Sequence, residues 1–142
     1  MRFMIIVKAS AESEAGAPPN SEAIAAMGRY NEELIAAGVL LAADGLHPSS
    51  NGARVRFDGG RIEVIDGPFS ETKELIAGYW LIDVKSKDAA LEWVKRIPFK
   101  DGEEVELRKA FEASDFPADS VTEEHLAKEA AWREEHQKPI TN

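Results

Sequence analysis

The stretch "RFMIIVK" (residues 2–8) is apolar on both faces of an extended chain. Because side chains alternate across a strand, Phe3 and Ile5 share one face and Met4 and Ile6 share the other. A strand with one face in water would alternate apolar with polar residues instead. We therefore expect residues 2–8 to form a central strand that is covered on both sides.

The bulk composition describes an ordinary small domain. A chain of 142 residues with 44% hydrophobic and 30% charged residues is long enough for one core and short for two. The net charge of −9 disfavours nucleic acid as a direct partner, because phosphate binding needs clustered Lys and Arg, and no such cluster occurs. With no cysteine, disulfides, thiol catalysis and Cys-ligated zinc are excluded. The first apolar run is too short for a secretory or membrane segment, so we expect a cytoplasmic protein.

Further elements follow from periodicity, caps and turn residues. Two helices are predicted at residues 21–38 and 86–98, the first with a buried stripe of Ile24, Met27, Leu34 and Ile35. Besides the first strand, we expect strands at residues 39–44, 77–84 and 103–111 and a hairpin at residues 53–66.

The hairpin turn is placed at Gly59 and Gly60. This register pairs apolar Phe57 with Ile62, and it also pairs Arg56 with Glu63. Moving the turn back by one residue would put Arg56 opposite Arg61, which is unfavourable.

The resulting order is strand, helix, strand, hairpin, strand, helix, strand. This order predicts an α+β, ferredoxin-like sandwich with an inserted β-hairpin. Two helices cover only one face of such a sheet, so the apolar residues on the other face need a second cover. A second copy of the chain is the simplest one, which predicts a homodimer packed sheet to sheet.

The domain is expected to span residues 1–111, followed by an acidic C-terminal extension at residues 112–142. The extension holds eight acids against three bases and contains one predicted helix at residues 121–137, with Thr122 as its N-cap. Trp132 is the candidate anchor of this helix.

Several motifs resemble those of the DGPF-domain family, a bacterial branch of the YCII-related proteins. They are "RFMIIVKA", "EELIAAGVLLAADGLHPSS" and "VIDGPFSETKELIAGYWLIDV", the last with the hallmark Asp66-Gly67-Pro68-Phe69. The resemblance implies a ferredoxin-like dimeric α/β barrel and little about activity. It also implies a possible association with an extracytoplasmic-function sigma factor. The wider group is linked to acid/base chemistry by a His and an Asp, whose matching positions here hold Met27 and Ile97.

The hallmark and the residues after it offer the first candidate site. Asp66 is a candidate general base or ligand anchor, or the first residue of an Asx-turn. Phe69 is a candidate ligand contact or a plug beneath the turn. Glu71 and Lys73 form a charged group suited to an anionic or amide ligand, or else they belong to a solvated turn.

The segment "ADGLHP" offers the second candidate. Asp44 is close in sequence to His47, the one histidine of residues 1–111, so the two suit proton transfer or ligand binding, although a His before Pro in a polar loop is often simply exposed. Lys8 contributes positive charge to a cavity or ends its strand in solvent.

We predict no metal site and no cofactor, because no convergent ligand spacing and no glycine-rich phosphate loop occurs. The function expected is a homodimer that binds a small molecule in its barrel cavity, as a binder or as an enzyme of acid/base type with Asp66, His47 and Lys73 as catalytic candidates. The alternative is an interaction module that works with a sigma factor.

Overall fold

The main sheet of the computed structural model, which describes residues 1–70 and 74–142, has four antiparallel strands. They run in the order β2-β5-β1-β6, with β1 in the interior as predicted. With the helices between them, this order is the ferredoxin-like arrangement, so the predicted α+β fold is confirmed. The strands are β1 (Arg2–Lys8), β2 (Leu40–Gly45), β5 (Ile76–Asp83) and β6 (Val105–Lys109).

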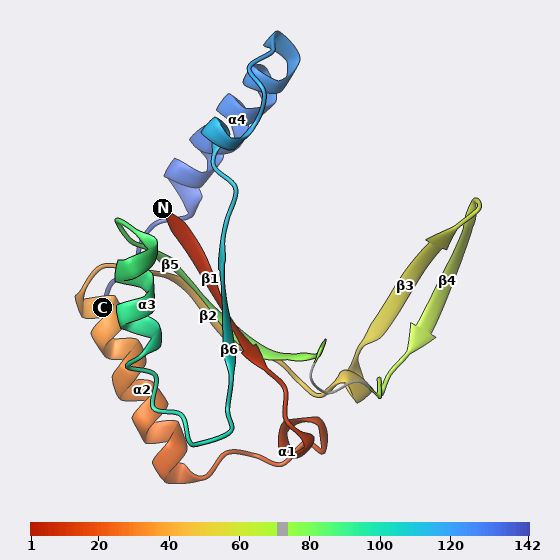
Figure 1. The fold of residues 1–142 in the computed structure, drawn as a ribbon, viewed down its shortest axis with the longest axis vertical. Helices are drawn as coiled ribbons and strands as arrows, with labels where there is room; N and C mark the ends of the chain where they lie inside the picture. Colours follow the sequence, from red (N-terminus) through yellow and green to blue (C-terminus); the bar gives the residue numbers. More distant parts are fainter. Residues whose placement is uncertain (71–73) are drawn as a thin grey trace.

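Two helices, α2 (Ser21–Ala36) and α3 (Lys87–Val94), lie side by side on one face of this sheet (Figure 1). The side chain of Asn20 accepts a hydrogen bond from the backbone N–H of Ala23, and Ser86 caps α3 in the same way. Helix α2 stops where Gly38 adopts a φ of 70°, a conformation that glycine tolerates best. Between β1 and α2, where no helix is expected from the sequence, residues 11–14 form the one-turn helix α1 (Ala11–Glu14).

The core lies between these helices and the sheet, with Ile5, Leu34 and Ile82 fully buried. Tyr30 packs edge-on against Trp80, and its hydroxyl donates to the carbonyl of Trp93 at 2.9 Å. Burial raises the pKa of Tyr30 to about 12.

The predicted stripe of α2 was wrong at Ile24, which is exposed. At about 100° per residue, Ile24 lies roughly 80° around the helix from Leu34. Tyr30 and Leu34 are the buried residues of α2 instead.

No helix formed by the described residues lies on the opposite face of the sheet (Figure 1). Strand alternation points Met4, Ile6, Tyr79 and Leu81 to this side. We call this surface the open face. It is the apolar surface that the sequence of β1 predicts to need a second cover.

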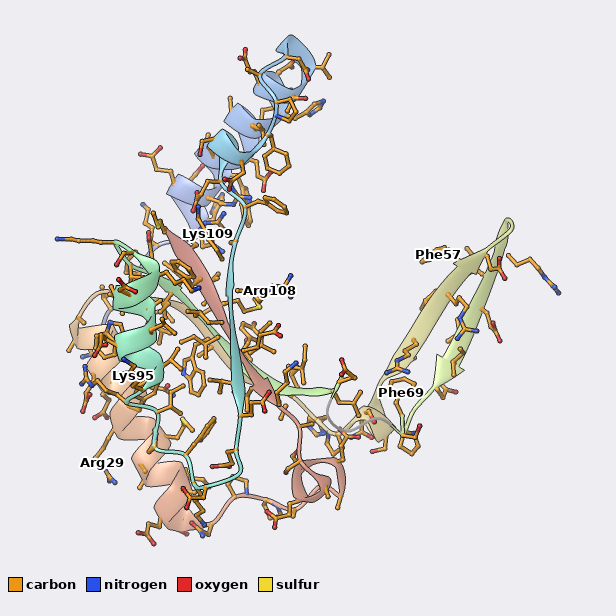
Figure 2. The ribbon with its side chains drawn as sticks, viewed as in Figure 1. Arg29, Phe57, Phe69, Lys95, Arg108 and Lys109 are labelled. Carbon is orange, nitrogen blue, oxygen red and sulfur yellow. The ribbon has the colours of Figure 1, made fainter. Side chains whose placement is uncertain are left out.

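The inserted hairpin consists of β3 (Ala53–Asp58) and β4 (Arg61–Asp66), and we call it the arm. Its register is the predicted one, with Phe57 opposite Ile62 and Arg56 opposite Glu63. Both turn glycines have positive φ, as a two-residue hairpin turn requires. The arm stands away from the sheet, with Phe57 near its free end and Phe69 at its base (Figures 1 and 2).

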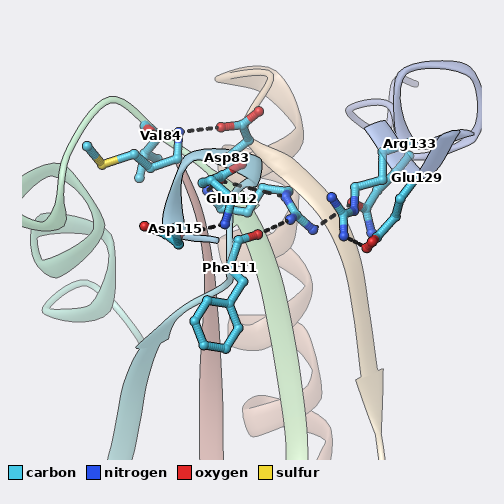
Figure 3. A network of polar contacts seen from close by, with 10 residues as sticks. Asp83, Val84, Phe111, Glu112, Asp115, Glu129 and Arg133 are labelled. Atoms are coloured by element: carbon cyan, nitrogen blue, oxygen red, sulfur yellow. Dashed lines mark hydrogen bonds and ion pairs between the residues drawn. The ribbon is translucent and has the colours of Figure 1, made fainter. Parts of the chain in front are cut away.

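The acidic extension holds the short helix η3 (Ala113–Asp115) and the helix α4 (Ser120–His136). Asp119, and not Thr122, caps α4; Thr122 instead donates its backbone N–H and its hydroxyl to the Asp119 carboxylate. Figure 3 shows the polar contacts that join this extension to the sheet. Arg2 donates to the carbonyl of Phe111 and to the side chain of Gln137, tying β1 to both ends of the extension.

The last residues return to the sheet, because the backbone N–H of Ile140 donates to the carbonyl of Leu40 at 2.8 Å. This bond satisfies part of the outer edge of β2. Within residues 1–70 and 74–142, no helix has the length and apolar content to cross a bilayer.

A tight corner connects the arm to the sheet through η1 (Ser49–Asn51). Gly67 donates its N–H to the carbonyl of Gly52, and a Cβ built at Gly67 would lie 1.8 Å from the carbonyl oxygen of Ser49. Only glycine fits this approach of two backbones.

We expect Gly67→Ala to lower the free energy of unfolding by about 1–3 kcal/mol, because the backbone must shift to make room for the methyl group. Gly52→Ala is the matched control, since its Cβ would meet the same Ser49 oxygen at an ordinary 3.5 Å. Urea unfolding of both variants measures the effect. Equal stabilities for the two variants would contradict this account of the corner.

Candidate functional site

Polar side chains stand at both edges of the open face. At the β2 edge, the hydroxyl of Tyr79 donates to the carboxylate of Asp44 at 2.8 Å. At the β6 edge, Glu106 lies between two cations, with Lys8 at 3.8 Å and Arg108 at 3.3 Å. Figure 2 shows Arg108 pointing to the side of the sheet away from α2 and α3.

The register of the sheet places these groups around an apolar centre. Met4 pairs with Leu81 and Ile6 pairs with Tyr79, so four side chains form a patch in the middle of the face. Leu81 is buried, while Met4, Ile6 and Tyr79 are half-buried. An apolar floor with a few polar groups at its rim is the usual composition of a small-molecule site.

In the Tyr79–Asp44 pair, the proton resides on the Tyr79 hydroxyl. The hydrogen bond to Asp44, followed by partial desolvation and the carboxylate charge, raises the pKa of Tyr79 above its ordinary value of 10.0. The phenol therefore keeps its proton at neutral pH. While it donates to Asp44, the phenol oxygen can accept a hydrogen bond from a ligand, and the carboxylate can accept a further one.

The two residues of the "ADGLHP" segment find different partners. Asp44 holds Tyr79, whereas His47 Nδ1 lies 3.0 Å from the side-chain amide nitrogen of Asn51. An amide nitrogen donates, so Nδ1 accepts and the proton of a neutral ring resides on Nε2. His47 is exposed in the loop that leads to the arm.

The hallmark residues lie at the base of the arm. Asp66 is exposed at the end of β4, opposite Ala53. Phe69 is half-buried beneath the guanidinium of Arg54, which lies 3.9 Å from the ring centre. The expected charged group of Glu71 and Lys73 falls outside the described residues.

A hydrogen-bonded chain organises this corner. The Phe69 backbone N–H donates to the hydroxyl of Ser49 at 3.0 Å, and that hydroxyl donates to the carboxylate of Glu14. Glu14 also accepts from the Ser49 backbone N–H at 3.1 Å. The corner thus joins α1, η1 and the residues after β4, and these bonds give it a structural role.

Tyr79, Glu106 and Arg108 are the functional candidates that sequence reasoning missed. The alternation of side chains along a strand could have identified Tyr79. Because Trp80 and Ile82 face the core, Tyr79 must lie on the other face of β5. Among residues 1–70 and 74–142, no group of three His, Asp or Glu side chains is placed to hold a metal ion.

We expect Asp44→Asn to lower the pKa of Tyr79 toward 10.0, because the substitution removes the charge and the best acceptor. The chain has only two tyrosines, and burial raises the pKa of Tyr30 to about 12, so tyrosinate absorbance follows these two groups alone. Tyr79→Phe identifies the Tyr79 step. An unchanged titration in Asp44→Asn would show that the hydrogen bond does not form in solution.

Two known proteins are similar to this chain. The uncharacterised protein R00369 of Rhizobium meliloti (strain 1021) is 40% identical over 63 residues, which are 44% of this chain and 51% of that protein. The match therefore spans about half the length of this curated relative. The solved structure of 5-chloro-2-hydroxyhydroquinone dehydrochlorinase from Burkholderia phenoliruptrix AC1100, in complex with 2,5-dihydroxybenzoquinone, is 15% identical with a TM-score of 0.40; the match covers 82% of this chain and 100% of that one.

The family comparison covers most of the chain. The model of the YCII-related domain matches residues 1–114, which include the whole main sheet, both covering helices and the arm. The match ends close to the domain boundary expected at residue 111. The chain therefore belongs to the YCII-related domain family.

Proposed function

We propose that this chain acts as a homodimer in which two open faces meet and enclose a cavity for a small molecule. The observation that carries the proposal is the one-sided cover of the sheet, which leaves the apolar patch around Ile6 without a helix. Burial of apolar surface contributes about 25 cal/mol per Å², so pairing two such faces is favourable.

The rim of the open face defines the ligand class. The phenol oxygen of Tyr79 and the carboxylates of Asp44 and Glu106 accept hydrogen bonds, and Lys8 and Arg108 supply positive charge. Around an apolar floor, these groups suit a small aromatic or alicyclic molecule with carbonyl, hydroxyl or carboxylate substituents. A large or highly charged ligand would not match the apolar centre.

Acid/base chemistry fits the same face. Asp44 is the candidate base, and Tyr79, which is hydrogen-bonded to Asp44, is the candidate group to pass a proton between that carboxylate and a ligand. His47, Asp66 and Phe69 at the arm base, with Glu71 and Lys73, remain proposed contributors to a ligand site. Because Met27 and Ile97 occupy the positions that match the His and Asp of the wider group, acid/base chemistry in this chain would need other residues.

A second candidate function is a regulatory interaction module, as in an association with a sigma factor. The observation that favours it is α4, which packs mainly against η3 and leaves Val121 and Trp132 exposed. A dimer that leaves Trp132 bare, together with a failed ligand search, would support this second function.

We expect the native protein to sediment at twice its chain mass of 15.6 kDa. Ile6→Glu should convert it to a folded monomer, since the carboxylate would be buried between the two sheets. Ile24→Glu is the control, because Ile24 is already exposed on α2. Sedimentation velocity and far-ultraviolet circular dichroism report mass and fold together. A native protein that stays monomeric would refute the proposed dimer.

For the ligand, we expect members of a panel of small phenols, quinones and aromatic acids to raise the melting temperature of the native protein. The same compounds should lose most of this shift in Tyr79→Phe and Asp44→Asn. Lys95→Ala, on the far side of α3, should respond like the native protein. Compounds that stabilise all four proteins equally bind elsewhere, and the proposed site would then be wrong.

A further inference from the structure

The arm presents one apolar face to solvent. Pairing places Val55 opposite Val64 and Phe57 opposite Ile62, so these four side chains share a face. Their exposed fractions are 50% and 64% for the first pair and 76% and 68% for the second. Charged residues, among them Arg56 and Glu63, occupy the opposite face.

The arm has little to stabilise it within its own chain. Its two strands pack mainly against each other, and all of their residues except Ile65 are exposed. A two-stranded hairpin alone is marginally stable in water. An apolar face of this kind requires a surface to pack against, and a surface of matching chemistry is present elsewhere on the molecule.

That surface is an apolar groove between η3 and α4. Two adjoining hollows of about 320 and 290 Å³ share Phe116 and Leu126 in their lining. Phe111 lines the second hollow, is 70% exposed, and lies 5.1 Å from the ring of Phe116. Charged side chains also contribute to the lining: Glu123 in the first hollow, and Arg2, Glu112, Glu129 and Arg133 in the second, where Arg133 is paired with Glu129.

The groove and the arm lie at opposite ends of the sheet. The groove follows β6 at the Phe3 end of β1, where Phe3 pairs with Lys109. The arm precedes β5 at the other end, where Lys8 pairs with Ile76. Figure 1 shows α4 and the arm projecting from these separate ends, so the arm does not fill the groove of its own chain.

We propose that the arm of one chain packs its apolar face into the groove of a second copy, and that the second arm does the same in return. This inference rests on the proposed homodimer. A two-fold axis that crosses the strands brings the arm end of one sheet beside the groove end of the other. In this exchange, each arm–groove contact covers the apolar face of one chain's arm and the groove of the other chain.

The charges of the two surfaces do not oppose this contact. Residues 53–66 of the arm carry three arginines against three acids and are neutral, whereas residues 112–142, which hold most of the groove, carry eight acids against three bases. The arginines lie on the charged face of the arm, opposite Phe57 and Ile62, so the apolar face carries the contact.

The absence of cysteine from the chain allows a direct test. Ile62→Cys is prepared in one sample and Phe116→Cys in another, and the two are mixed at concentrations that allow chains to exchange. A short bifunctional maleimide should then produce a covalent dimer in the mixture. Either variant alone should give little covalent dimer, because the two copies of residue 62, or the two copies of residue 116, lie far apart in the exchanged dimer. Ile62→Cys mixed with Ile24→Cys is the control pair and should stay uncrosslinked.

A second measurement follows the strength of the contact. Phe57→Asp should raise the dissociation constant of the dimer by about tenfold or more, since it removes a buried aromatic anchor. A dimer with no cross-link in the mixed sample and no change in Phe57→Asp would overturn the arm exchange and leave the sheet-to-sheet dimer standing. A native protein that is monomeric throughout would overturn both.

Discussion

The cover of the sheet on one side only is the constraint from which the rest of this structure follows. Helices α2 and α3 bury Phe3 and Ile5 of the central strand almost completely. The same strand carries Met4 and Ile6 on its other face, where no helix of the described residues lies. This second apolar surface is the one that the proposed homodimer would cover.

Much of the fold was predictable because its signals are local. The arm register follows from two glycines and from the like-charge clash that any slip would create at Arg56 and Arg61. The order of elements follows from caps and periodicity. Predictions failed where the angle around a helix decided burial, as at Ile24, or where one carboxylate and one hydroxyl were the candidates for the same cap, as at Asp119 and Thr122.

The candidate site was harder to predict because it depends on long-range register. Asp44 meets Tyr79 only because β2 pairs with β5 across a bulge between Leu40 and Ala42, and no sequence pattern within β2 specifies that irregularity. Sequence proximity suggested His47 as the companion of Asp44, whereas the structure pairs His47 with Asn51. Nearness along the chain is a weak guide where a strand directs successive side chains to opposite faces.

The corner at Gly67 connects the arm to the main sheet. Gly67 allows the backbone to approach Ser49, and the Glu14–Ser49–Phe69 chain of hydrogen bonds holds that approach in place. A rigid corner sets the direction in which the arm leaves the sheet. An arm that must reach a groove on another molecule needs a defined exit, since each free hinge would add conformational entropy to the cost of the contact. Gly67 and Phe69, together with Ser49 and Glu14, therefore fix the corner from which the arm leaves the sheet.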